Sequence, residues 1–254
     1  MLHVQRQQEI LDRLRARKSV TVRALSEELY VSEATVRRDL TELAARGFLH
    51  RSHGGAILVE DDGGEISRFL RGEQNPEGKR RMAELTLPYL TEGNSFFLDW
   101  SSSVRALAGV WEPSHRTVIT PGLETALLFS RMRDVQVILP GGNVRYLSGA
   151  AGGALALRML DDMRADVLVC SCGGLDLQGN ISEGNADTAE MKGRMVRHSK
   201  RHILLADATK LGVFRAFRFA TLADIDVLVS DCPPGAELRR LCEAAGTRLV
   251  APEK

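Results

Sequence analysis

The feature that most constrains the fold is a regular alternation of short apolar runs with helical stretches after residue 76. Each run is rich in Val, Ile, Leu or Phe and has the length of a strand buried on both faces. Alternating β and α segments favour a mostly parallel sheet that is covered by helices on both sides. The expected strands are Ser95–Leu98, 117–119, 135–139, 165–169, 202–205 and Val227–Val229.

The residues before this alternation follow a different pattern. Residues 1–58 carry short stretches with apolar residues at helical spacing, whereas residues 60–65 (EDDGGE) have no apolar periodicity and suit a solvated linker. A chain of 254 residues is long enough for one small and one medium domain. We therefore predict a small N-terminal domain at 1–58, a linker at 59–75 and a larger α/β domain at 76–254.

Charge is distributed unevenly along the chain. The net charge is only +1, but residues 1–58 carry ten Lys and Arg against seven Asp and Glu, and residues 59–77 are acidic. Positive charge is thus concentrated in the N-terminal domain, which is therefore where we expect a nucleic-acid-binding surface.

Composition argues against several classes of protein. No apolar run approaches the ~20 residues of a membrane span, and residues 1–18 lack the apolar stretch of a signal peptide. Cys170 and Cys172 are expected to be small buried thiols on one face of a strand. His50 and His53 have no third ligand at a metal-like spacing, so neither a metal site nor a cofactor is predicted. We expect a cytoplasmic protein.

Three helices are expected in the N-terminal domain, and the third is the most informative. Thr21 and Ser32 are the expected N-cap residues of the second and third helices, and both are also predicted to be DNA-binding residues. In the third helix Val36, Leu40 and Leu43 form a buried seam at i, i+4 and i+7. At about 100° per residue, the far side of this helix and its flanks carry small, hydroxyl and cationic side chains, namely Ala34, Thr35, Arg37, Arg38 and Thr41.

Such a face suits insertion into the major groove of DNA, because Arg forks onto guanine or phosphate and a methyl group can meet thymine. The alternative is an ordinary solvated helix face. Residues 48–58 decide between the two, since they are typical of a strand, a turn and a strand with cations and glycines at the turn. We expect Arg51, His53 and Gly54 to contact the DNA backbone as the wing of a winged helix-turn-helix.

Two segments, VSEATVRRDL at residues 31–40 and RSHGGA at 51–56, resemble the signature of the DeoR family of bacterial transcriptional regulators. The resemblance covers nearly the whole chain. It implies that Thr35, Arg37 and Arg38 face double-stranded operator DNA, that residues 51–54 touch its backbone or minor groove, and that the protein is a homodimer or homotetramer. Asp39 is expected instead to orient a neighbouring arginine through an ion pair.

Polar and glycine-rich residues follow five of the expected strands. Because the carboxyl ends of parallel strands meet at one edge of a sheet, ligands of such folds bind there. Five loops of this kind together favour a ligand pocket. We expect it to be formed by Asp99, Ser101, Ser102, Ser103, Thr120, Gly141, Gly142, Gly173, Asp176, Asp207 and Lys210.

The serine loop in this set has a definite physical use. Hydroxyls and free backbone N–H groups at a helix N-terminus bind an anion, and Lys210 would supply a second positive charge. Asp99, Asp176 and Asp207 would accept hydrogen bonds from sugar hydroxyls. In the alternative interpretation the serines only cap a helix and Lys210 is solvated.

The family resemblance implies a sensor domain similar in fold to ribose 5-phosphate isomerase and an effector that is a phosphorylated sugar. Two positions depart from the family pattern. Members usually carry Gly-Thr-Thr where this chain has serines at 101–103, and Asn where it has Pro121. Serines still bind an anion, whereas proline removes an N–H and a side-chain amide. These departures leave open an unusual sugar phosphate, a different acid or no effector at all.

The predicted function is a sequence-specific DNA-binding transcriptional regulator, a repressor relieved by a phosphorylated sugar or related metabolite, and not an enzyme. One alternative is an isomerase-like enzyme fused to a DNA-binding head, with Glu183, Glu190 and Asp176 as candidates for the general acid and base. The other is a regulator that binds DNA without any effector.

Overall fold

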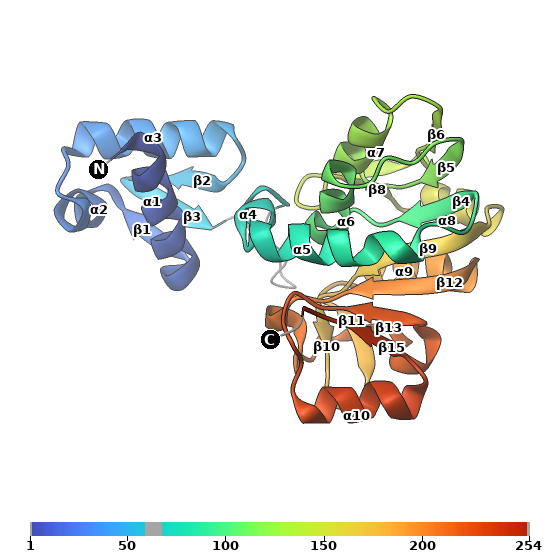
Figure 1. Cartoon of the computed structure of the whole chain (residues 1–254). Helices are drawn as coiled ribbons and strands as arrows, with labels where there is room; N and C mark the ends of the chain where they lie inside the picture. Colours follow the sequence, from blue (N-terminus) through green and yellow to red (C-terminus); the bar gives the residue numbers. More distant parts are fainter. Residues whose placement is uncertain (1, 59–67, 253–254) are drawn as a thin grey trace. The chain divides into compact units, whose positions relative to one another are not determined.

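The computed structural model describes residues 2–58 and 68–252, which separate into two compact units, Met1–Gln74 and Asn75–Lys254 (Figure 1). Each unit has its own hydrophobic core. Most of the linker expected at 59–75 lies outside the described residues, because 59–67 are not among them. Within the remainder of that segment, α4 (Arg68–Glu73) is helical, and its Leu70 is buried in the N-terminal core.

The N-terminal unit is a winged helix-turn-helix. A small antiparallel sheet in the order β1-β3-β2 packs beside three helices, and a tight turn joins the two wing strands. Ile10, Leu25 and Leu40 are fully buried between the helices. The elements before α4 are α1 (His3–Arg17), β1 (Ser19–Thr21), α2 (Val22–Leu29), α3 (Glu33–Ala45), β2 (Leu49–Ser52) and β3 (Gly55–Leu58).

Local chemistry explains where these helices begin and end. The Thr21 hydroxyl accepts a hydrogen bond from the Ala24 N–H, and the Ser32 hydroxyl accepts one from the Thr35 N–H, so both predicted N-caps are confirmed. After α3 the chain turns at Gly47, where φ is +79°, a conformation that favours glycine. Gly54 has φ of +78° and allows the tight turn between β2 and β3.

The C-terminal unit is built on seven parallel strands in the order β15-β14-β12-β9-β4-β5-β6. This confirms the predicted α/β class. The strands of the sheet are β4 (Ser95–Leu98), β5 (Arg116–Ile119), β6 (Val135–Ile138), β9 (Ala165–Ser171), β12 (Ser199–Leu205), β14 (Val227–Val229) and β15 (Arg248–Val250).

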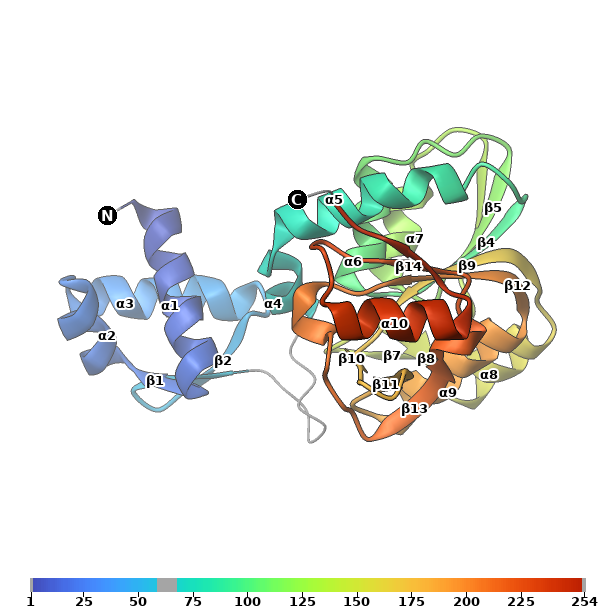
Figure 2. The same ribbon diagram turned by 60° about the horizontal axis from the view of Figure 1, so that its bottom comes forward.

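Helices cover both faces of this sheet (Figure 2). In β9, Val167 and Val169 pack on one side whereas Leu168 and Cys170 pack on the other, so alternate residues serve two cores. The helices and 3-10 turns are α5 (Pro76–Thr86), η1 (Leu87–Tyr89), α6 (Ser102–Arg105), η2 (Ala106–Gly109), α7 (Leu123–Phe129), α8 (Ala154–Asp161), α9 (Ala186–Arg197), η3 (Ala208–Lys210), η4 (Leu222–Asp224) and α10 (Ala236–Ala245).

Two smaller β structures and the edge strand β15 were not expected. One is the hairpin of β7 (Asn143–Arg145) and β8 (Ala150–Gly152), and the other is a sheet of β10 (Gly174–Leu175), β11 (Asn180–Glu183) and β13 (Phe217–Thr221). These strands are two to five residues long, too short for a period of two to stand out in the sequence.

The two predicted buried thiols are confirmed. Cys170 and Cys172 lie at and just beyond the end of β9 with almost no exposed surface. Burial raises the pKa of Cys172 to about 12, and it also raises the pKa of Cys170, so neither is a reactive thiolate at neutral pH. Among the described residues, no helix has the length and apolar character needed to cross a bilayer.

Candidate DNA interface and effector pocket

The third helix of the N-terminal unit turns its seam inward. Val36, Leu40 and Leu43 are buried to 1% exposure or less. The residues predicted for the opposite side all reach solvent, with Thr35 half-buried and the rest exposed, namely Ala34, Thr35, Arg37, Arg38 and Thr41. The predicted DNA-facing residues of α3 therefore form one continuous solvent-facing surface.

The polar groups on this surface are held by partners within α3. Arg37 Nη2 lies 2.8 Å from Glu33 Oε2, and Arg38 Nε lies 3.3 Å from Glu42 Oε1. The Thr41 hydroxyl donates to the Arg37 carbonyl at 2.8 Å. Exposed ion pairs of this kind contribute about 0.3–0.5 kcal/mol, so a phosphate or base edge can replace the carboxylates at little cost.

Asp39 has a different role, and its partner is not one of the adjacent arginines. The carboxylate is fully buried and accepts hydrogen bonds from Nε and Nη2 of Arg6, on α1. These bonds raise the pKa of Arg6. Asp39 does pair with an arginine, but the prediction of a neighbouring arginine is wrong, because the ion pair joins the middle of α3 to α1 and does not orient Arg37 or Arg38. The partner lies 33 residues away in the sequence, where no local pattern indicates it.

The same junction brings His3, Asp39 and Glu42 close enough to share an ion. His3 Nε2 lies 3.2 Å from Asp39 Oδ1 and 3.0 Å from Glu42 Oε2. Because Arg6 already neutralises the Asp39 carboxylate, a divalent cation would have to compete with a guanidinium. The arrangement is therefore explained as a polar joint between α1 and α3.

The wing presents the other predicted contacts. His53 and Gly54 are exposed at its turn, and Arg51 Nη1 donates to the Gly55 carbonyl at 2.7 Å, which holds that side chain along the hairpin. Tyr30 was not predicted from the sequence; it is 94% exposed between α2 and α3 and has a left-handed backbone with φ of +55°. An exposed aromatic with a hydroxyl at this turn is suited to contact a DNA phosphate.

In the C-terminal unit, the strand order changes direction between β4 and β9, which makes the crevice at their carboxyl ends the expected ligand position. A buried charge cluster lies there. Lys192, on α9, places Nζ 2.9 Å from Asp99 Oδ2 and 2.7 Å from Glu183 Oε1, and donates to the Ser171 carbonyl at 2.7 Å. The Trp100 ring centroid is 5.4 Å from the same nitrogen.

The electrostatics of this cluster keep Lys192 protonated. Burial lowers the pKa of the ammonium, but Asp99 and Glu183 outweigh burial and the pKa is raised overall. Asp99 also accepts hydrogen bonds from the N–H groups of Ser101 and Ser171. Lys192 was missed in the sequence, because one lysine in an amphipathic helix gives no sign that it points inward.

Several predicted ligand residues support their own turns instead of projecting into open space. Burial raises the pKa of Asp176, but hydrogen bonds from the Asn180 side-chain amide and from the N–H groups of Asn180 and Gln178 lower it overall. Asp207 accepts from the Thr209 N–H, and Thr120 accepts from the Gly122 N–H. Ser101 caps α6 by accepting from the Val104 N–H, and Ser102 and Ser103 are the first residues of that helix. Gly141, Gly142 and Gly173 lie in the loops after β6 and β9, and Lys210 ends η3.

A pocket of about 160 Å³ lies beside this cluster, with Trp100 in its wall. The β7–β8 hairpin and the first turn of α9 form the rest. Its lining residues are Trp100, Asn143, Arg145, Ser148, Ala150, Ala151, Gly152, Gly153, Asp187, Thr188 and Met191. None of them is among the predicted ligand residues, although the predicted loops after β4 and β6 lead directly into the pocket wall.

Arg145 is the cation in this pocket. Its Nη1 lies 3.1 Å from Asp187 Oδ2 in an exposed pair and 3.4 Å from Asn185 Oδ1. Asn185 also caps α9 by accepting from the Thr188 N–H at 2.8 Å. A guanidinium therefore lies next to the N-terminal turn of a twelve-residue helix, an arrangement that favours an anion.

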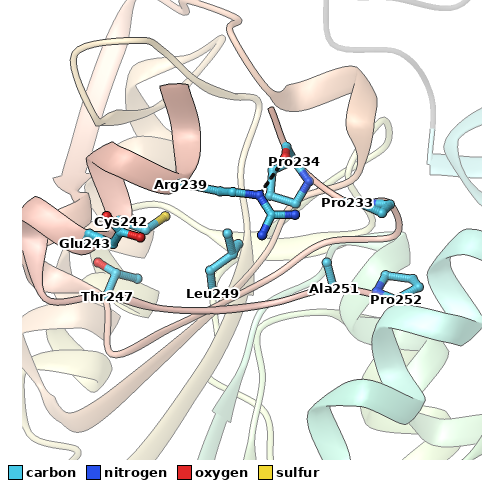
Figure 3. Close-up of a pocket in the computed structure, with 9 residues that line it drawn as sticks. All are labelled: Pro233, Pro234, Arg239, Cys242, Glu243, Thr247, Leu249, Ala251 and Pro252. Atoms are coloured by element: carbon cyan, nitrogen blue, oxygen red, sulfur yellow. Dashed lines mark hydrogen bonds between the residues drawn. The ribbon is translucent and has the colours of Figure 1, made fainter. Parts of the chain in front are cut away.

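A larger pocket, of about 530 Å³, lies elsewhere (Figure 3). It runs between α10 and β15, with Thr247, Leu249 and Ala251 on one side and Arg239 and Glu243 on the other. Because β15 is the outermost strand, two strands separate this groove from the crevice between β4 and β9. The larger volume of this groove is therefore no reason to assign it as the effector site.

The geometry defines a class of protein, a winged helix-turn-helix reader joined to an α/β domain that has a pocket beside its buried charge cluster. Residues 6–62 match the model of the DeoR-like helix-turn-helix domain, and residues 74–232 match that of the DeoR C terminal sensor domain. The chain belongs to the DeoR family and is a DNA-binding transcriptional regulator.

Two related proteins agree with this assignment. The chain is 33% identical over 254 residues to the HTH-type transcriptional regulator GlpR of Haloferax volcanii, covering 98% of each chain. It is 26% identical over 235 residues to the glycerol-3-phosphate regulon repressor of Escherichia coli, covering 92% of this chain and 93% of the relative. Ribose 5 phosphate isomerase A from Neisseria gonorrhoeae matches at 13% identity with a TM-score of 0.40, over 54% of each chain.

Proposed function

We propose that this regulator is a homo-oligomeric cytoplasmic repressor that is released from its operator by a phosphorylated sugar or polyol. The names of two relatives support the repressor role, the glycerol-3-phosphate regulon repressor and the HTH-type transcriptional repressor CsqR of Escherichia coli. In this proposal Thr35, Arg37 and Arg38 read the operator, while Arg51, His53 and Gly54 contact its backbone. Ser32 and Thr21 support the reader by capping its helices.

The effector part of the proposal depends on one observation, the position of Arg145 beside the start of α9. A phosphate would replace the exposed carboxylate of Asp187 as the partner of the guanidinium, and the Thr188 and Ser148 hydroxyls would donate to it. Asn143 and Trp100 would then contact the carbon skeleton and hydroxyls of the ligand. In this account, the aspartates predicted to bind hydroxyls, Asp99, Asp176 and Asp207, shape the loops around the ligand.

The ligand test uses thermal unfolding of the whole chain with sn-glycerol 3-phosphate, fructose phosphates, ribose 5-phosphate and the matching unphosphorylated compounds. A ligand present at 100 times its dissociation constant should stabilise the protein by about 2.7 kcal/mol. The same ligand should have no effect on Arg145→Ala, while the control Arg164→Ala, an exposed arginine of the same unit, should respond as the wild type does. No response to any phosphorylated compound would favour an effector-independent regulator.

The DNA test is to sequence the genomic fragments that the purified protein retains. A repressor should retain a small set of sequences that overlap promoters, and the effector identified above should release them. Retention of random fragments would contradict sequence-specific reading by α3.

An isomerase-like enzyme is the second candidate, and the Lys192 cluster argues against it. A general base needs a carboxylate that is free to take a proton, whereas Lys192 binds both Asp99 and Glu183. Glu190 pairs with Arg194 on the outer side of α9, and Asp176 is engaged in its turn. We expect no turnover of pentose or hexose phosphates, and measurable isomerisation that Glu183→Gln abolishes would restore the enzyme hypothesis.

A further inference from the structure

One side chain of the N-terminal unit is unfavourable for folding in two respects. Tyr30 has φ of +55° and ψ of +44°, in the left-handed region that disfavours residues with a Cβ. Asn75, His115 and Asp134 also have positive φ, but they belong to residue types that tolerate it better. Tyr30 is also 94% exposed, so its ring contributes almost no buried apolar surface. The fold alone therefore gives no reason for a tyrosine at this position.

Hydrogen bonds fix the backbone of the turn that carries Tyr30. The N–H groups of Tyr30 and Val31 both donate to the Ser26 carbonyl. The Ser26 hydroxyl donates in turn to the Val31 carbonyl at 2.6 Å. Ser32, the next residue, is the N-cap of α3. Tyr30 is therefore held just before the reading helix, and a glycine in its place could form the same backbone hydrogen bonds.

Tyr30 also continues a row of exposed side chains along α2. Arg23, Glu27 and Tyr30 are spaced i, i+4 and i+7, so they follow one side of that helix. Arg23 and Glu27 form an exposed ion pair of 3.0 Å. The hydrogen bond to Glu27 raises the pKa of Arg23, and the charge of Glu33, the first residue of α3, adds a smaller effect in the same direction. The row therefore lies on the side of α2 that is near the start of the reading helix.

We propose that Tyr30 is part of the DNA interface and that its hydroxyl donates a hydrogen bond to a phosphate of the operator. In helix-turn-helix proteins the second helix reads bases with its N-terminal residues, while the first helix crosses the backbone. A side chain at the turn between them is then close to the crossed strand. Tyrosine is one of the residues that hydrogen-bond DNA phosphates. Among the described residues, no group occupies the Tyr30 hydroxyl.

This contact rests on the proposed operator reading by α3, and it accounts for a residue that the fold does not explain. A phosphate carries no sequence information, so the contact adds affinity on every duplex and positions the reading helix without selecting a base. The hydroxyl is neutral and displaces no counterion, which separates its effect from that of an arginine.

The first experiment measures folding and DNA binding in Tyr30→Gly. Glycine adopts positive φ without strain, so the variant should unfold at the same temperature as the wild type or higher, as followed by circular dichroism of the whole chain. Its affinity for a promoter duplex that the wild type retains should fall about tenfold, the equivalent of one hydrogen bond to a charged group. Misfolding would instead lower the unfolding temperature together with the affinity.

The second experiment removes only the hydroxyl. Tyr30→Phe keeps the ring and should lose most of the affinity that Tyr30→Gly loses, by the same factor on promoter and random duplexes. The dependence of affinity on salt should keep the slope of the wild type. The control Tyr146→Phe, at an exposed tyrosine of the C-terminal unit, should bind DNA as the wild type does.

Three results would overturn the inference: wild-type affinity in Tyr30→Gly, a loss in Tyr30→Gly that Tyr30→Phe does not share, or an equal loss in Tyr146→Phe. Failure of the proposed function looks different. If the wild type does not prefer promoter DNA to random DNA, sequence-specific reading fails whatever Tyr30 does. If the wild type does prefer it and both Tyr30 variants bind equally well, only the tyrosine contact is wrong.

Discussion

The two units use ionised side chains in opposite ways. On the reading helix Arg37 and Arg38 are exposed, and each is paired with a glutamate one turn away. In the sensor domain Lys192 is buried and bound by two carboxylates and a carbonyl. The exposed arginine pairs are weak and can exchange partners. In the buried lysine cluster, loss of one partner leaves an uncompensated charge in the core, which is strongly destabilising.

This difference follows from what each surface must do. A DNA reader has to exchange its own partners for phosphates and bases at every binding event, so strong internal pairs would oppose binding. A sensor pocket has to keep its shape without ligand, and buried, fully satisfied charges fix the loops around it. Whether an ion pair is exposed or buried therefore says more about its role than the residue types that form it.

The largest effect is expected from Lys192→Met in the sensor core. The substitution keeps much of the volume but leaves the carboxylates of Asp99 and Glu183 close together without their cation. We expect a loss of about 3–5 kcal/mol in the free energy of unfolding. Both tryptophans of the chain, Trp100 and Trp111, lie in this unit, so their fluorescence in a urea titration reports its unfolding alone.

The control for that variant is Arg133→Met, at a cation whose side chain is 95% exposed. It should change stability by no more than about 0.5 kcal/mol. Equal losses in the two variants would remove the contrast between the buried and the exposed charges.

A second prediction concerns Asp166, which joins strand β9 to the start of β4. The carboxylate accepts from the Lys200 ammonium at 2.9 Å, from the Asn94 N–H at 2.9 Å and from the Ser95 hydroxyl at 3.0 Å. The Lys200 hydrogen bond, followed by that of Asn94, holds the pKa of Asp166 well below its usual range. Its ionised form therefore stabilises the fold above the unfolded-state pKa of about 3.9, and this contribution is lost as the pH falls.

We expect Asp166→Asn to lower the free energy of unfolding by about 1.5–3 kcal/mol at pH 7, the range for hydrogen bonds to a charged group. Below about pH 4 the difference between variant and wild type should shrink, because protonation of the Asp166 carboxyl in the unfolded chain then favours unfolding of the wild type. Urea titrations at several pH values measure this. If the difference in the free energy of unfolding stays constant down to pH 2, the shape of the Asp166 side chain, and not its charge, stabilises the contact between β9 and β4.

The sequence predicts the reader better than the sensor site, and the reason is the range of the interactions. The seam of Val36, Leu40 and Leu43 and the cap at Ser32 are patterns within one helix, and the structure matches them. The pairs Arg6–Asp39 and Asp99–Lys192 join residues that lie far apart in the chain, and no spacing rule connects them.

The five polar loops show the same limit. Their position at one sheet edge follows from parallel strands, but which side chains project into a pocket depends on turn geometry. Asp176 and Asp207 hold turns, whereas Arg145 reaches the pocket from a short hairpin that the sequence does not reveal.

The third prediction tests the exposed arginines directly. Arg38→Ala should cost about 1–3 kcal/mol in binding to the operator and relax specificity at one base pair, if Arg38 reads a base. Fluorescence anisotropy with operator and random duplexes at matched salt measures both quantities. Equal weakening on the two duplexes would show a phosphate contact, and no weakening would place Arg38 outside the interface.

The smallest effect is expected from removing a competitor of the DNA. In Glu33→Gln the carboxylate that pairs with Arg37 becomes neutral, which frees the guanidinium and removes a negative charge near the phosphates. An exposed i, i+4 pair is worth about 0.2–0.5 kcal/mol, so affinity for any duplex should rise about twofold at low salt. The control Glu84→Gln breaks an equivalent pair with Arg80 on α5 and should leave binding unchanged. If Glu33→Gln binds no better than the wild type, the ion pairs on the reading helix are not exchanged for DNA, and the contrast with the buried lysine loses its functional meaning.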